Sequence, residues 1–110
     1  MIIERMVFNL KFGKEAEAFQ LWDDIGKLWE KSSKDAAQYG VFKDRKIKLL
    51  SGLSGRNSVL IIEMDLRSLG EVSPMAAYWS IHEDVQKVYR QFVACCDNSE
   101  GQMFKVEKIV

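Results

Sequence analysis

The chain has 110 residues, of which 47% are hydrophobic and 11% aromatic, and this is enough to bury one core. We therefore expect a single domain over residues 1–110. Sixteen basic and sixteen acidic side chains cancel, so the overall charge provides no attraction to nucleic acid or to an anionic membrane.

The N-terminal residues alternate between apolar and polar side chains. In residues 2–12, one face of an extended chain would carry Met6, Phe8, Leu10 and Phe12. This period of two predicts a half-buried strand. The early charges and the alternation after them indicate neither a signal peptide nor a membrane span, so we expect a cytoplasmic protein.

The period changes after Gly13 and predicts an amphipathic helix, because apolar residues now recur every three or four positions. The apolar stripe of this helix comprises Ala18, Phe19, Leu21, Trp22, Ile25, Leu28 and Trp29. The polar residues that follow predict a loop, with a short helical turn near 36–39.

Residues 45–66 contain two apolar runs joined by "SGLSGRN", which predicts a β-hairpin. In the first run, Ile47 and Leu49 alternate with lysines. The second run places Leu60, Ile62, Met64 and Leu66 on one face, and Val59, Ile61, Glu63 and Asp65 on the other. Both faces of this strand therefore begin apolar, and we expect both to be partly covered.

Several helix starts are predicted after the hairpin. Ser68 and Ser73 each begin a short helical piece, and "SIHE" at 80–83 has the spacing of a capping box for a longer helix. The stripe of that helix comprises Ile81, Val85, Val88, Tyr89 and Phe92, and we expect it to end near Cys96. "DNSEG" then predicts a turn, and alternation at 104–107 predicts a last strand with Phe104 and Val106 on the core face.

The element order β-α-β-β-α-β defines the expected fold, which is α+β and ferredoxin-like, with two helices on one face of a four-stranded antiparallel sheet. The other face would carry apolar residues among polar ones. Its candidates are Ile3, Val7, Leu50, Val59, Ile61, Met103 and Ile109, mixed with Arg5, Asn9, Glu63, Lys105 and Glu107. A face this apolar predicts an interface, and a second copy of the sheet is its simplest cover.

These segments together resemble the dimeric α/β-barrel superfamily, and within it the NIPSNAP-like proteins. The resemblance is carried by the opening strand, the "SGLSGRNSVLIIEMDL" hairpin, "SLGEV", Trp79, the following helix and the short closing strand. It implies a homodimer whose two sheets face each other. Members of the superfamily include cofactor-free monooxygenases acting on polyketides or quinols, haem-degrading proteins, and proteins without an assigned activity.

The haem-degrading members combine a strand-one asparagine, a tryptophan before the second main helix and an iron-ligating histidine ten residues later. Asn9 and Trp79 match the first two, but Tyr89 stands where the histidine would fall, and His82 follows Trp79 by three residues. Tyrosine ligates haem iron as the phenolate. We therefore expect no bound cofactor and only weak haem binding.

The candidate pocket residues are Asn9, Trp22, Trp79, His82 and Tyr89. Each has a structural alternative, because aromatic residues at helical spacing often belong to the core, and a first-turn histidine is often solvated or caps the helix. Glu63 and Asp65 fit acid-base chemistry or a metal, or ion pairs with Arg5 or Lys105. The adjacent cysteines, Cys95 and Cys96, are expected to be reduced thiols. We expect no metal site.

The sequence contains no nucleotide-binding, serine-hydrolase or paired-histidine motif. The first functional hypothesis is a homodimer that is structural or binds a small apolar or aromatic ligand. The second is a small monooxygenase, cofactor-independent or haem-related. An RNA-binding module is not supported, because "SVLIIEMDL" presents no basic or aromatic residue to stack bases.

Overall fold

The computed structural model describes residues 1–31, 47–52, 58–67 and 82–109. Their elements are β1 (Ile2–Leu10), α1 (Glu15–Lys31), β2 (Ile47–Ser51), β3 (Val59–Leu66), α4 (Glu83–Val93) and β4 (Cys96–Lys105). The predicted β-α-β-β-α-β order is therefore confirmed. The helical turns predicted near 36–39, at Ser68 and at Ser73 lie outside the described residues.

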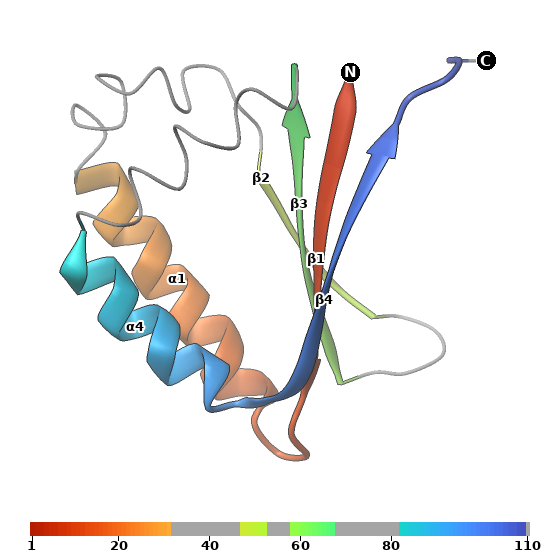
Figure 1. The fold of residues 1–110 in the computed structure, drawn as a ribbon. Helices are drawn as coiled ribbons and strands as arrows, with labels where there is room; N and C mark the ends of the chain where they lie inside the picture. Colours follow the sequence, from red (N-terminus) through yellow and green to blue (C-terminus); the bar gives the residue numbers. More distant parts are fainter. Residues whose placement is uncertain (32–46, 53–57, 68–81, 110) are drawn as a thin grey trace.

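The four strands form one antiparallel sheet in the order β2-β3-β1-β4, as a ferredoxin-like fold requires. Helices α1 and α4 run side by side along one face of this sheet (Figure 1). We call this face the helix face. No helix among the described residues covers the opposite face, which we call the open face (Figure 1).

The core lies between the helices and the helix face, and its members follow the predicted periodicities. The buried hydrophobic residues are Phe8, Leu10, Leu60, Ile62 and Leu66 from the sheet, Ala18, Ile25, Val85 and Phe92 from the helices, and Cys95. Even-numbered positions of β1 and β3 thus point toward the helices. The inward-facing residues of β1 and β3 were predictable because the alternation of apolar side chains on the helix face is unbroken from Met6 to Leu10 and from Leu60 to Leu66.

The end of β1 differs from the prediction, because Phe12 is 99% exposed and contributes nothing to the core. The strand ends at Leu10, and the chain turns at Gly13, whose φ of 78° suits a residue without a side chain. The backbone N–H of Lys14 donates to the carbonyl of Lys11 at 3.1 Å and closes the turn. Glu15 and Glu17 then begin α1, where carboxylates favour the positive end of the helix.

The start and end of α4 also differ from the prediction. The helix begins at Glu83 with His82 at the N-cap position, and it ends at Val93. Ser80, the predicted cap, lies outside the described residues. The backbone N–H of Ala94 donates to the carbonyl of Arg90, which closes the last turn three residues before the predicted end near Cys96.

The last strand begins earlier than predicted. The "DNSEG" residues belong to β4 and pair with β1 from Asn9 to Met6, so the predicted turn was wrong. Asn9 pairs with Asn98 and Leu10 pairs with Cys96, which leaves Asp97 as an extra residue, a β-bulge.

The bulge reverses which residues of β4 point toward the helices. Cys96 packs on the core, but beyond Asp97 the odd-numbered residues share the helix face, since Ser99 pairs with Phe8. Met103 and Lys105 therefore belong to the helix side and Phe104 to the open face, opposite to the prediction. Phe104 is stabilised there by the Arg5 guanidinium, which lies 5.3 Å from its ring centroid.

Candidate functional site

An aromatic cluster connects the two helices to the centre of the sheet. The rings of Phe8 and Phe92 meet edge to face with centroids 4.8 Å apart, and Trp22 lies 5.3 Å from Phe92. Tyr89 meets Trp22 edge to face at 6.2 Å. Such geometry places the positive edge of one ring on the negative face of the next. Phe8 and Phe92 are buried and belong to the core, whereas Trp22 and Tyr89 are half-buried.

Trp22 and Tyr89 also bring polar atoms into this apolar cluster. The Nε1 atom of Trp22 is buried and has no hydrogen-bond partner among the described residues. Burial, and secondarily the nearby Cys96, raise the pKa of Tyr89. The phenol is thus neutral at neutral pH, and the phenolate that iron ligation requires is disfavoured at this position.

The structure does not gather all the predicted pocket residues. Asn9 lies on the open face, where its side-chain amide donates to Asn98 Oδ1, so the sheet separates it from Trp22 and Tyr89. His82 is half-buried at the N-cap of α4, and its side chain makes no capping hydrogen bond. Of the two structural alternatives for His82, solvation and capping, the second does not involve its side chain. Trp79 lies outside the described residues.

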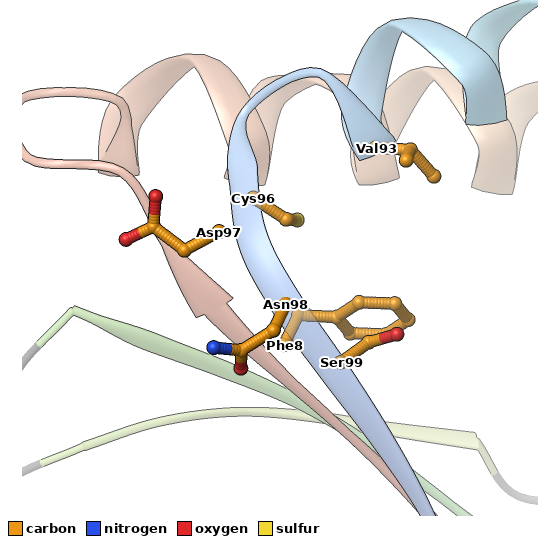
Figure 2. A pocket seen from close by; sticks show the side chains of 6 residues that line it. All are labelled: Phe8, Val93, Cys96, Asp97, Asn98 and Ser99. Atoms are coloured by element: carbon orange, nitrogen blue, oxygen red, sulfur yellow. The ribbon is translucent and has the colours of Figure 1, made fainter.

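A small pocket lies where the end of α4 meets the start of β4 (Figure 2). It is lined by Phe8, Val93, Cys96, Asp97, Asn98 and Ser99, and its volume is about 90 Å³. Pockets that hold a drug-sized ligand measure roughly 300–1,000 Å³. This pocket therefore has room for a few water molecules or a very small group only.

The two cysteines at this end of the molecule are free thiols, as predicted. The Sγ of Cys95 donates to the carbonyl of Gln91 and that of Cys96 to the carbonyl of Phe92, at 3.7 and 3.5 Å. Burial is the main cause that raises the pKa of both thiols, and it raises the pKa of Cys96 to about 11. Neither thiol is thus a nucleophile at neutral pH, since the thiolate is the reactive form.

The open face alternates apolar and polar rows that run across the strands. One row contains Leu50, Ile61 and Val7 and ends at Glu100, and another contains Ile3 and Phe104 beside Asp65. Between them the register aligns Lys48, Glu63, Arg5 and Gln102, one from each strand. We call these four residues the polar row.

An ion pair stands at the centre of the polar row. Arg5 donates to the Oε2 atom of Glu63 from Nη2 at 2.7 Å and from Nε at 3.0 Å. The side chain of Glu63 is 13% exposed and that of Arg5 is 37% exposed. The predicted pairing of Glu63 with Arg5 is confirmed, whereas Lys105 approaches Glu107 at 3.9 Å at the sheet edge.

The described residues also bear on metal binding and on membrane insertion. No group of three or more histidine, cysteine or carboxylate side chains there has the arrangement of a metal site. None of the helices in those segments has the length and apolar character needed to cross a membrane.

Comparison with known proteins yields similarity at the level of the fold. No family model matches the sequence, and no curated protein matches it. Among solved structures, an uncharacterised NIPSNAP domain protein from Burkholderia xenovorans has a TM-score of 0.75 at 13% identity, over 100% of this chain and 98% of that one. A NIPSNAP family protein from Agrobacterium tumefaciens has a TM-score of 0.74 at 16% identity, over 94% and 90%.

The fold also extends to enzyme candidates. A candidate antibiotic biosynthesis monooxygenase from Deinococcus radiodurans has a TM-score of 0.63 at 11% identity, over 100% of this chain and 96% of that one. The predicted resemblance to NIPSNAP-like proteins is thus confirmed for the fold, which is ferredoxin-like. At these identities the comparison establishes architecture, and any activity must be argued from the site.

Phe104 is the aromatic residue of the open face that the sequence pattern did not predict. Its alternation with Lys105 and Glu107 suggested a core position, but the bulge at Asp97 shifts the pattern by one residue. Arg5 on the neighbouring strand was the available signal, because an arginine and an aromatic residue on adjacent strands favour a shared face.

Proposed function

We propose that the chain is a small-ligand-binding homodimer that assembles through the open face. The open face is the observation that carries this proposal. It combines half-buried apolar side chains, among them Val7 and Ile61, with the Arg5–Glu63 ion pair. The side chain of Glu63 is only 13% exposed even without a covering layer. Contiguous apolar patches of more than a few hundred Å² usually mark an interaction site.

The dimensions of the open face suit a second sheet. Four strands at about 4.8 Å spacing and roughly eight residues at about 3.3 Å give a face of about 19 by 26 Å. Covering it would bury roughly 500 Å² per copy, or about 1,000 Å² in total, which is the lower bound for a biological interface. Sheets that pack face to face keep their strands within about 30° of each other.

The dimer is tested by light scattering after size-exclusion chromatography at micromolar concentration. We expect the wild-type protein to have twice the mass of one chain. Ile61→Asp should give a monomer, because it places a charge in an apolar row of the open face. Lys27→Asp on the exposed side of α1 serves as the control and should remain a dimer. A monomeric wild-type protein would refute the proposal.

For the ligand site we propose the aromatic cluster around Trp22 and Tyr89. These two side chains are half-buried and carry one polar atom each, which suits a small aromatic molecule with a polar group. The neutral dye N-phenyl-1-naphthylamine fluoresces more strongly in apolar sites and provides a probe. Tyr89→Ala should weaken dye binding at least fivefold, whereas Val93→Ala on the exposed side of α4 should not.

A monooxygenase is the second candidate function. It is favoured by the fold shared with candidate antibiotic biosynthesis monooxygenases and by a tryptophan and a tyrosine in contact in the helix-face cluster. Oxygen uptake with 1,4-dihydroxynaphthalene tests it. Oxygen uptake above the uncatalysed rate that is lost in Trp22→Phe would support the monooxygenase function. Uptake equal to the uncatalysed rate would contradict it and favour the binding function. A cytoplasmic location and the absence of nucleic-acid and membrane partners stay predictions.

A further inference from the structure

The polar row of the open face has a charge order that is complementary to itself. From edge to edge it reads basic, acidic, basic and neutral, as Lys48, Glu63, Arg5 and Gln102. Because the strand order is β2-β3-β1-β4, Glu63 and Arg5 lie on either side of the midline of the sheet. The two opposite charges therefore flank the place where a symmetry axis of a face-to-face pair would pass.

Only one of two simple dimer symmetries brings opposite charges together. A two-fold axis parallel to the strands at the midline exchanges the positions of β1 and β3, so Arg5 faces the partner's Glu63. An axis perpendicular to the strands along the polar row instead places Arg5 against the same residue of the second copy, and likewise for Glu63. Like charges in a desolvated interface cost several kcal/mol, so the row favours the first arrangement.

We propose that Arg5 and Glu63 of two copies form a four-membered ion cluster at the centre of the dimer, and that this cluster selects a second copy of the same chain as the partner. The inference rests on the proposed homodimer. Within one chain, Arg5 binds a single carboxylate oxygen of Glu63. The other carboxylate oxygen thus has room for a donor from the second copy.

The rows on either side protect this cluster from water. One row is apolar at Leu50, Ile61 and Val7, and the other is apolar at Ile3 and Phe104. The carboxylates of these two rows, Glu100 and Asp65, lie on β4 and β3. Once a second sheet covers these rows, the central charges lie in a medium of low dielectric constant, where a mismatched charge is most unfavourable. The apolar rows would then supply affinity, and the polar row would supply the choice of partner and orientation.

The test exchanges the two charges. The double variant R5E/E63R keeps the ion pair within each chain and should form a homodimer with a Kd within tenfold of the wild type. It should not pair with the wild-type chain, because Arg5 would face the basic side chain introduced at position 63. We expect native mass spectrometry of a refolded equimolar mixture to show fewer than one tenth of the heterodimers that random mixing gives.

A matched control exchanges an ion pair outside the interface. Lys14 and Glu17 are paired at 3.2 Å on the exposed start of α1. The double variant K14E/E17K should form heterodimers with the wild type at the random proportion. Single variants sharpen the test, because R5E and E63R should each dimerise at least a hundredfold more weakly than the wild type, and an equimolar mixture of the two should recover dimers.

The outcomes distinguish failure of the ion cluster from failure of the homodimer itself. Random heterodimers between the wild type and R5E/E63R would overturn the ion cluster and leave the homodimer in place. A folded R5E/E63R that is monomeric beside a dimeric wild type would also overturn it. A monomeric wild type would overturn both the cluster and the homodimer.

Discussion

The helix face and the open face of the same sheet differ in how deeply their apolar residues are buried. On the helix face, Phe8 and Leu60 are at most 2% exposed and pack against α1 and α4. On the open face, Val7 and Ile61, which are the neighbours of Phe8 and Leu60 in the sequence, are only half-buried. The first face is a complete core, and the second has the mixed apolar and polar composition that the proposed dimer would cover.

The two faces also treat polar groups differently. The core contains no buried polar or charged residue among those described, whereas the open face places the Arg5–Glu63 pair near its centre. A hydrophobic core gains stability from area and packing, with little orientation preference. A charged row within an apolar surface instead distinguishes one partner orientation from another, so it serves recognition.

The largest effect is expected from truncating the helix face. Phe92→Ala should reduce the free energy of unfolding by about 3–5 kcal/mol, because the ring is fully buried and contacts Phe8 and Trp22. Val93→Ala, the neighbouring residue that is 47% exposed, should change it by no more than about 0.5 kcal/mol. Urea denaturation monitored by circular dichroism measures both. Similar losses would show that α4 does not complete the core as described.

A smaller effect is expected from breaking the ion pair of the open face. Arg5→Met should lower stability by about 1–3 kcal/mol, because it leaves the half-buried Glu63 carboxylate without its donor. Adding Glu63→Leu should restore most of the loss, since both charges are then gone. Lys14→Met removes an exposed partner and should be nearly neutral. These unfolding measurements require equal protein concentrations, because the proposed dimer would contribute to stability in a concentration-dependent way.

Two glycines outside the sheet should respond in opposite directions to alanine. Gly26→Ala in α1 should raise stability by about 0.5–1 kcal/mol, because alanine favours the helix and an added Cβ meets nothing within 4 Å. Gly13→Ala meets nothing either, but its φ of +78° is left-handed and should lower stability by about 1 kcal/mol. Thermal unfolding measures both. A stabilising Gly13→Ala would show that this turn relaxes to an ordinary conformation.

The smallest effect concerns pH and Cys96. Burial raises the pKa of this thiol to about 11, so between about pH 9 and pH 11 the folded state holds a proton that the unfolded state has lost. The thiol therefore contributes stability below about pH 9, and this contribution decreases as pH rises to about 11. Cys96→Ala should flatten the stability curve in that window. Reaction of the native protein with iodoacetamide should also be slow at pH 8.

The strongly periodic parts of the fold could be predicted from sequence. Strands β1 and β3 and helix α1 show uninterrupted apolar periods, so Phe8, Leu60 and Ile25 were placed correctly. The β4 strand could not be predicted in the same way. Its first half is polar because it lies at a solvated sheet edge, and its apolar alternation resumes only after the bulge, where the count of faces has changed.

The candidate site was only partly predictable for a related reason. Trp22 and Tyr89 were identified because aromatic spacing on helices reports which residues face inward, and the two rings do meet. Asn9 was assigned to the same pocket from a family pattern, although it is adjacent to the core residue Phe8 and must therefore point to the other face. The ion pair of the open face depends on strand register, which a single strand does not reveal.

The bulge at Asp97 shifts the alternation of β4 by one residue, so odd and even positions exchange faces beyond it. Cys96, before it, belongs to the monomer core, and Phe104, after it, belongs to the open face, although both numbers are even. If Asp97 were paired with Asn9, every later residue of β4 would move one position along β1, and Met103 would stand opposite Ile3, where Phe104 now lies near Arg5. The composition of the open face thus depends on one unpaired residue in β4 as well as on the residue types that follow it.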